Sequence, residues 1–385
     1  MNWRDWQIGR ILGIPIKVHP SWFAIFLLVT WSLATGILPE ELPHLSPVRY
    51  WAMGALAALL LFASVLLHEL GHSYIALRYH IPIGQIILFV FGGMAQMHKE
   101  PPHPRAEFLI AIAGPLVSFL LGGLCLGGVA LVEGWHGSAG FVVLGSLLAT
   151  TNIYLGLFNL IPGFPLDGGR VLRAGLWAWS GDFLRATQRA SLAGQGFGFG
   201  FGLLGAGLLL GVVTGHLPPP LAGNAAWVML IGGFLYTAAA AARRQAAFRA
   251  RLVAISVAEL MVSEVVTIDA DMSVQDAVSQ YFLPYGYRGF PVCRKGQLVG
   301  MVSVKEVQGL ASTLWSWRRI EDILTPWTLG MEIMPTSTAV EALEQMVREG
   351  QSRLAVTKDG QVIGLVTHSG IARYLQQGGV PQARG

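Results

Sequence analysis

Six long apolar stretches constrain the fold of this chain more than any other feature of its sequence. A transmembrane helix needs about 20 predominantly apolar residues. Only 12% of the 385 residues are charged, against about 25% in a typical soluble domain. We therefore predict a polytopic α-helical membrane domain of about six transmembrane helices. The candidate spans lie at 21–38, 51–77, 106–132, 139–161, 196–214 and 223–242.

The distribution of Lys and Arg predicts how the spans cross the membrane, because basic residues favour cytoplasmic loops. Fourteen of them lie in the N-terminal segment, in the loops after the second and fourth spans, and in the tail after the sixth, whereas the opposite loops contain only Arg49. We therefore expect both termini to be cytoplasmic. The net charge of +4 then reflects membrane topology, and we expect no nucleic-acid partner.

Two segments have the pattern of strands instead of helices. Residues 8–18 are apolar pieces broken by Gly and Pro, and residues 83–97 hold an apolar run around Gly92 and Gly93, which is typical of a hairpin. Backbone that is not helical is tolerated at membrane depth only where it is buried in protein or lines a wet cavity. We therefore expect a membrane-embedded β-hairpin and a cavity beside the second span.

The second span contains the sequence HELGH, with His68, Glu69 and His72. Histidines at positions i and i+4 lie on one helical face and can bind one Zn²⁺, and the glutamate between them is placed to act as the general base on a zinc-bound water. Ionisable residues inside a span are costly and are functional by default. The alternative is an interhelical hydrogen-bonded cluster without a metal.

A catalytic zinc keeps three protein ligands and one open position. Asp167 is the candidate third ligand, because it follows the fourth span in NLIPGFPLDGG, where Pro162, Gly163 and Pro165 break the helix and allow the chain to turn inward. His72 and Asp167 both precede basic residues at a predicted cytoplasmic end, so both are expected at the same depth. The alternative role of Asp167 is that of a helix cap or turn residue.

These motifs resemble those of the site-2 protease family of zinc intramembrane metalloproteases. The resemblance rests on HELGH and NLIPGFPLDGGR, on Ala113-Gly114-Pro115, and on the early GIPIKVHPSW, which is similar to the branch that contains the sporulation factor protease. It implies a prokaryotic cell membrane as the location. It also implies zinc ligation by the residues His68, His72 and Asp167, with Glu69 as the catalytic base.

The same resemblance implies roles for several further residues. Asn159 is expected to hydrogen-bond the substrate backbone or the developing oxyanion. The hairpin at Gly92 and Gly93 is expected to bind an unwound substrate segment as an added strand. Asn152 shares a helical face with Asn159, which leaves two roles open: it lines the same cavity and binds substrate, or it makes an interhelical hydrogen bond.

The chain changes character after the membrane domain, predicted at 1–242. A basic helical linker at 243–256 precedes two copies of a repeat, at 257–312 and 318–378. Each copy has helices around a strand hairpin, with predicted turns at 294–297 (RKGQ) and 358–361 (KDGQ). The repeat resembles a tandem pair of soluble α/β CBS domains, modules of the cystathionine-β-synthase type. This resemblance implies a homodimer formed through the pair and clefts for ATP or another adenine nucleotide.

The residues at the expected nucleotide clefts depart from the family pattern, in which an acid follows a Ser or Thr by three residues. Ser303 is followed by Glu306, a longer carboxylate, and Thr367 is followed by Gly370. Two interpretations remain open: the pair binds a nucleotide through Ser303, Glu306 and Thr367, or it is a dimerisation and substrate-docking module without a ligand.

Together these features predict an intramembrane zinc metalloprotease in a lipid bilayer. It is expected to hydrolyse a peptide bond within or near a transmembrane segment of a membrane-tethered regulatory protein, to release a cytoplasmic fragment, and to be regulated by its CBS domains. The alternative is a CBS-regulated membrane metal transporter or channel. Transporters tend to show a repeated membrane half, and this sequence has a single HExxH helix and no such repeat.

Overall fold

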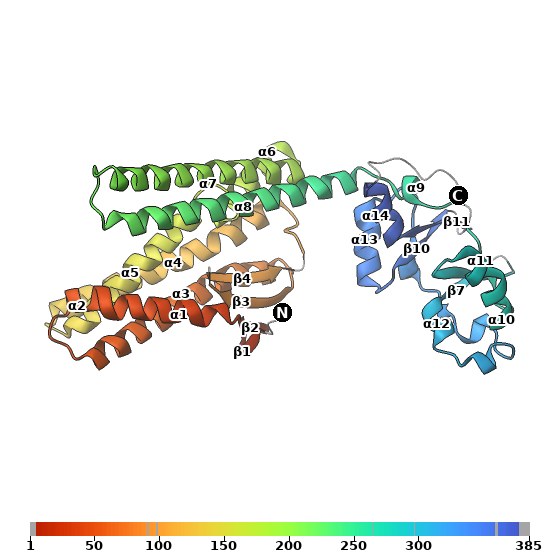
Figure 1. Cartoon of the computed structure of the whole chain (residues 1–385), viewed down its shortest axis with the longest axis horizontal. Helices are drawn as coiled ribbons and strands as arrows, with labels where there is room; N and C mark the ends of the chain where they lie inside the picture. Colours follow the sequence, from red (N-terminus) through yellow and green to blue (C-terminus); the bar gives the residue numbers. More distant parts are fainter. Residues whose placement is uncertain are drawn as a thin grey trace. The chain divides into compact units, whose positions relative to one another are not determined.

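The computed structural model describes residues 5–90, 92–97, 99–263, 265–295, 297–358 and 361–376. The chain divides into two compact units, residues 1–246 and 247–385 (Figure 1). This division falls within the stretch predicted as the linker, which continues helix α8 as far as Val253.

Among the described residues of the first unit, six helices are long and apolar enough to cross a membrane. The first is a continuous run of α1, a π-helical stretch η1 and α2. Four of the six predicted spans fall within these helices, and the spans predicted at 139–161 and 196–214 run two residues and one residue past the ends of α5 and α7, so the polytopic helical fold is confirmed. Their bounds are α1 Ser21–Ser32, η1 Leu33–Ile37, α2 Leu38–Glu41, α3 Pro47–Arg78, α4 Pro104–Gly134, α5 Ala139–Asn159, α7 Phe183–Val213 and α8 Leu221–Val253.

Two features of the helices differ from the prediction. Helix α7 begins at Phe183 instead of near 196, because Asp182 caps it by accepting a hydrogen bond from the Arg185 backbone N–H at 2.9 Å. A further helix, α6 (Asp167–Ser180), follows the turn after α5 and ends at Gly181 in the left-handed conformation. Hydropathy misses α6 because it is too short and too polar to span a membrane.

A four-stranded sheet lies beside α3 (Figure 1). Its strands are β1 (Trp6–Ile11), β2 (Ile14–Val18), β3 (Ile83–Phe89) and β4 (Gly92–Met97), in the order β1-β2-β3-β4. Strands β2 and β3 are parallel, and the outer pairs are antiparallel hairpins. Ile14, Ile16 and Ile86 pack against Leu70 of α3. Both predicted strand segments are therefore present, and β4 forms one edge of the sheet.

The second unit contains the two predicted repeats, each with a hydrophobic core between a sheet and helices. The first sheet has the order β5-β6-β7-β8 and the second β11-β10-β9. Gly296, Asp359, Gly360 and the end of the second repeat at 377–378 lie outside the described residues. The strands are β5 Ile268–Asp269, β6 Gly289–Arg294, β7 Gln297–Ser303, β8 Thr325–Pro326, β9 Glu332–Ile333, β10 Arg353–Lys358 and β11 Gln361–Thr367.

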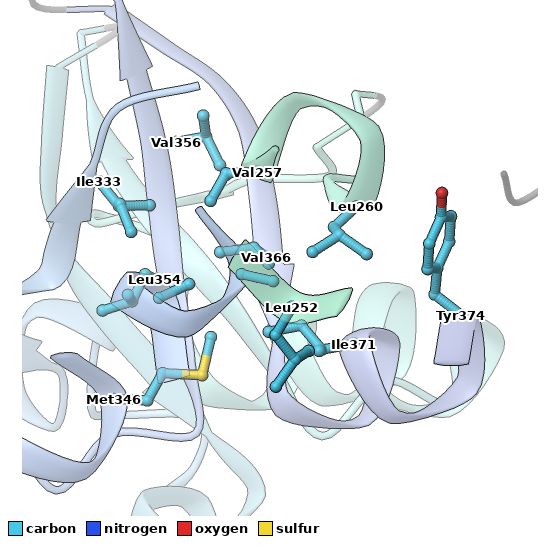
Figure 2. Packing of buried hydrophobic residues seen from close by; sticks show 12 residues of the cluster. Leu252, Val257, Leu260, Ile333, Met346, Leu354, Val356, Val366, Ile371 and Tyr374 are labelled. Atoms are coloured by element: carbon cyan, nitrogen blue, oxygen red, sulfur yellow. The ribbon is translucent and has the colours of Figure 1, made fainter. Parts of the chain in front are cut away.

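The helices of this unit cover its sheets. Val257 and Leu260, at the start of the first predicted repeat, pack in the core of the second repeat with Val366 and Ile371 (Figure 2). The core of the first repeat lies within residues 266–324 and includes Ile320, from the start of the second predicted repeat. The two repeats therefore exchange their leading segments, and the core of the second repeat combines residues from both ends of the unit. The helical elements are α9 Val257–Leu260, α10 Val274–Ala277, η2 Val278–Phe282, α11 Leu283–Tyr285, α12 Val304–Gln308, α13 Ala339–Arg348 and α14 His368–Gln376, with short 3-10 turns η3 Ser312–Leu314, η4 Ile320–Asp322 and η5 Leu329–Met331.

Candidate active site

Helix α3 and the start of α6 bring three metal-binding side chains together. His68 and His72 are almost fully buried, one turn apart on α3. The Nε2 atoms of both imidazoles lie 3.1 Å from Oδ2 of Asp167. One ligand atom from each of the three residues lies within 4.8 Å of the others. The structure therefore places at one point the three residues that the sequence predicts as a ligand set.

The other ring nitrogens of the two histidines are held by helix α4. His72 Nδ1 lies 2.6 Å from the backbone carbonyl of Ile110, which can only accept a hydrogen bond. Nδ1 of His72 therefore carries the proton, and the lone pair on Nε2 is directed toward Asp167. His68 Nδ1 lies 2.8 Å from the hydroxyl of Ser118. Such second hydrogen bonds orient histidines that bind metals.

The turn between α5 and α6 places Asp167 through close backbone packing. A Cβ on Gly168 would lie 2.3 Å from the Leu160 carbonyl oxygen, and one on Gly169 would lie 2.4 Å from the Gly163 carbonyl carbon. Neither glycine tolerates a side chain, because real Cβ contacts are never this short. The glycines after Asp167 therefore allow the chain to fold back, so that Asp167 begins helix α6 and also faces the imidazoles.

Gly114 of α4 lies directly beneath the two imidazoles. A Cβ on this residue would lie 2.2 Å from Nε2 of His72 and 2.6 Å from Nε2 of His68. The ligand atoms therefore occupy the space that any other residue would fill. In the sequence, Ala113-Gly114-Pro115 resembles a small-residue packing motif, and the sequence does not reveal which side chains need that space.

A cavity of about 190 Å³ opens beside this cluster. Glu69, His72 and Asp167 line one part of it, and Gly93 of strand β4 lines another. A Cβ on Gly93 would lie 2.5 Å from Cγ of Glu69, so the carboxylate packs directly against the edge strand. The remaining lining residues are Ser73, Ile83, Met94, Ala95, Met97, Pro165 and Arg170.

This donor set suits a zinc ion. Two imidazole nitrogens and one carboxylate oxygen are the ligands of many catalytic zinc sites, in which the fourth position stays open. Bonds of about 2.0–2.2 Å place neighbouring donors of a tetrahedral site about 3.4 Å apart, close to the 3.1 Å between each Nε2 and Asp167 Oδ2. The space that a Cβ at Gly114 would fill is directly beside these donors, and the cavity provides the open side.

An ion-pair network that the sequence analysis missed lies behind the cavity. Glu107 of α4 is fully buried, and its Oε1 accepts hydrogen bonds from Arg170 Nε at 3.0 Å and from an Arg173 terminal nitrogen at 2.6 Å. The Arg173 guanidinium stacks between Phe164 and Phe183. Because Glu107 lies in an apolar span, the cost of burying a carboxylate is the sequence signal that could have identified it.

The structure does not bring every predicted residue to the cavity. The amide of Asn159 donates to the Leu155 carbonyl of its own helix at 3.0 Å, and Asn159 is not among the described residues that line the cavity. Asn152 donates to Ser64 of α3 at 3.1 Å, which is the interhelical hydrogen bond that the sequence left open. Gly92 begins the edge strand β4 with a φ of +127°. That Asn159, Asn152 and Gly92 contact a substrate stays a prediction.

The residues predicted to bind nucleotide lie at helix N-termini. Ser303 and Glu306 form a capping box at the start of α12, where the carboxylate of Glu306 accepts hydrogen bonds from the backbone N–H and the hydroxyl of Ser303. The hydroxyl of Thr367 accepts from the Gly370 backbone N–H at 3.0 Å, before α14. The spacing of Ser303 and Glu306 therefore has a local structural explanation in this chain, which is the capping box.

Comparisons with known proteins identify the class. The family model for peptidase family M50 matches residues 56–135 and 127–205, and the CBS domain model matches 257–310 and 332–377. The chain is thus a multi-pass intramembrane zinc metalloprotease of the site-2 type with a C-terminal CBS pair. It belongs to peptidase family M50, and this assignment decides against the transporter alternative.

Related chains are similar in sequence to this one along almost their whole length. "Putative zinc metalloprotease Rip3" of Mycobacterium tuberculosis is 35% identical over 96% of this chain and 92% of its own. "Putative zinc metalloprotease sll0528" of Synechocystis is 33% identical over 96% and 95%. The solved site-2 protease from Methanocaldococcus jannaschii is 33% identical and covers 62% of this chain and 95% of its own, with a TM-score of 0.41.

Proposed function

We propose that this protease cleaves a membrane-tethered regulatory protein within or near its transmembrane segment and releases a cytoplasmic fragment. The observation that carries the proposal is the buried cluster of His68, His72 and Asp167, which opens on a cavity shared with Glu69 and with the edge strand β4. A peptide bond in a membrane helix is shielded by backbone hydrogen bonds and has no access to water. An enzyme for it must provide both a wet cavity and a place for an unwound strand.

His68, His72 and Asp167 would hold Zn²⁺. Bound there, zinc would supply Lewis acidity toward a water molecule and a peptide carbonyl. Glu69 accepts a proton from the water as its oxygen bonds to the carbonyl carbon. Glu69 then gives this proton to the amide nitrogen as the carbon–nitrogen bond breaks. The Ile110 and Ser118 contacts keep the imidazoles aligned.

Strand β4 is the proposed binding surface for the unwound substrate. It forms one edge of the sheet, and its residues Gly93, Met94, Ala95 and Met97 line the cavity. A substrate segment can extend the sheet by main-chain hydrogen bonds, which is β-augmentation. Gly93 lets the Glu69 carboxylate approach this strand closely, so an added strand would lie next to the base.

Replacement of Glu69 by Gln tests the proposed cleavage directly. We expect E69Q to retain one zinc per chain and to lose cleavage of a transmembrane reporter, because the amide cannot accept the proton from water. The measurements are zinc stoichiometry and product formation in detergent or liposomes. The control is E133Q, at the exposed end of α4, which should behave as wild type. Cleavage by E69Q at the wild-type rate would remove Glu69 as the base.

We also propose that the CBS pair binds ATP and regulates cleavage as a homodimer in the cytoplasm. The support is Arg353 of β10, which reaches the first repeat: a Cβ on Gly289 would lie 2.3 Å from its Nη1. Burial lowers the pKa of Arg353, Glu306 opposes this effect and Arg288 adds to it. Two arginines beside one carboxylate leave a positive charge that suits a phosphate group.

The exchange of Arg353 for Gln tests nucleotide binding. We expect R353Q to weaken ATP binding at least tenfold, which is about the loss of one charge-assisted hydrogen bond of 1.5–3 kcal/mol, as measured by calorimetry on the full chain. The control R348Q changes an arginine that contacts Glu349 on the exposed face of α13. No ATP binding by the wild-type chain would favour a docking module without a ligand.

A further inference from the structure

Arg170 forms a wall of the active-site cavity for which neither the sequence nor the proposed mechanism has a role. It lies one turn after Asp167 on α6, and it lines the same cavity as Glu69, His72 and Asp167. A cavity of about 190 Å³ is small enough for one bound group to touch opposite walls. A peptide carbonyl positioned for attack beside Glu69 would therefore lie within reach of the Arg170 side chain.

The hydrogen bonds of Arg170 leave donors free to bind a substrate. Its Nε donates to Glu107 at 3.0 Å, and within the described part of the chain its Nη2 contacts only the Met97 sulfur, at 3.9 Å. Nη1 has no acceptor among the residues that the structure describes. With respect to the described residues, Arg173 Nε is buried without a hydrogen-bond partner, whereas no nitrogen of Arg170 is both buried and unpartnered. The unpaired donor of Arg170 is therefore not fully buried, and Arg170 lines the cavity.

The charges behind the cavity do not cancel. Arg170 and Arg173 share the single carboxylate of Glu107, and the Arg170 side chain is 13% exposed. A cation with so little water around it is stabilised by an anion nearby, because the local dielectric is low. When water adds to a peptide carbonyl, the C=O electron pair moves to the oxygen, which becomes negative. This charge exists in the transition state and not in the bound substrate.

We propose that Arg170 donates a hydrogen bond from its guanidinium to the carbonyl oxygen of the scissile bond as negative charge develops there. This role rests on the proposed proteolysis at His68, His72 and Asp167. Glu107 fixes the guanidinium in advance, so little reorganisation is needed during the reaction. Recognition of an acidic substrate side chain is less favoured, because acidic residues are rare in transmembrane segments.

Kinetics of Arg170 and Arg173 variants test the role. R170Q should lower kcat about 100-fold, the usual loss for one oxyanion donor, with KM changed by less than about threefold and zinc content unchanged. R170K should lie between R170Q and wild type. R173Q is the matched control: it loses a contact with the same carboxylate but does not line the cavity, and it should lose much less activity. Equal losses in R170Q and R173Q would make the network purely structural and overturn the proposal.

Binding measurements separate this role from a general defect and do not need turnover. A phosphinic peptide carries the anionic tetrahedral centre of the transition state, whereas the matched peptide carries a neutral carbonyl. R170Q should weaken binding of the phosphinic peptide about 100-fold relative to wild type. The neutral peptide is measured in the E69Q background, which does not cleave it, and there R170Q should leave its affinity unchanged. Equal weakening of both ligands, or a rise in KM limited to acidic substrates, would overturn the proposal. If the wild-type chain bound no zinc and cleaved no substrate, the proteolytic function itself would be refuted.

Discussion

Two glycines leave the space that the polar side chains of the site occupy. Gly114 underlies Nε2 of both His68 and His72, and Gly93 underlies Glu69. The imidazoles and the carboxylate thus pack directly on backbone from α4 and β4, which fixes their positions more firmly than contact with flexible side chains. At the scale of the residue, the precision of the site therefore depends on absent side chains as much as on the ligands.

Substitution of Gly114 by Ala should disrupt metal binding. The new Cβ would lie 2.2 Å from His72 Nε2, so the ring must move away from Asp167. We expect zinc affinity to fall at least tenfold, the scale seen when the support of a ligand is lost, as measured by competition with a chelator. G123A is the control, because a Cβ on Gly123 of the same helix meets nothing within 4 Å. Wild-type zinc affinity in G114A would show that the imidazoles adapt.

The sequence predicted the candidate ligand set but not the residues that support it, for a physical reason. His68 and His72 follow a helical spacing, and Asp167 follows a helix break, so their roles depend on local pattern. Gly114 and Glu107 matter through contacts with α3 and α6, which are distant in the sequence. A glycine in a membrane helix has many uses, and only the three-dimensional structure shows which imidazoles it accommodates.

Close contact between helices α7 and α8 holds the last two spans together (Figure 1). A Cβ on Gly198 would lie 2.5 Å from the Tyr236 backbone nitrogen, and one on Gly205 would lie 2.6 Å from that of Met229. Lipid chains are as apolar as leucine, so close van der Waals packing of small residues drives such contacts. At the scale of the element, alternate glycines in 196–202 thus have different roles, because only one helical face meets α8.

Two alanine substitutions on α7 should therefore differ in their effect on stability, and only G198A should be destabilising. G198A forces a Cβ into the α8 backbone and should destabilise the membrane unit by about 1–3 kcal/mol, the usual cost of overpacking. G200A meets open space and should be neutral or stabilising by up to about 1 kcal/mol, the helix propensity difference. Thermal unfolding in detergent measures both. Equal effects would mean that α7 and α8 do not pack through this face.

The whole molecule combines a membrane unit, whose charged residues are concentrated near helix ends, in α6 and around the site, with a second unit of ordinary composition. Hydropathy predicted the six spans because burial in lipid makes the membrane-spanning part of each helix apolar. It could not predict α6, whose polar face binds Glu107 through Arg170 and Arg173. The repeat in the second unit was visible because each copy needs the same alternation of strands and helices to build a core.

The orientation of this molecule in the membrane is open to a direct test, because the basic residues predict that both termini and the CBS pair are cytoplasmic. In a chain without its two free cysteines, Cys125 and Cys293, single cysteines can replace the exposed serines Ser46, Ser138 and Ser312. An impermeant maleimide should label S46C and S138C in intact cells, because their loops contain few basic residues. It should label S312C only after the membrane is permeabilised. Labelling of S312C in intact cells would reverse the orientation and place the released fragment outside the cytoplasm.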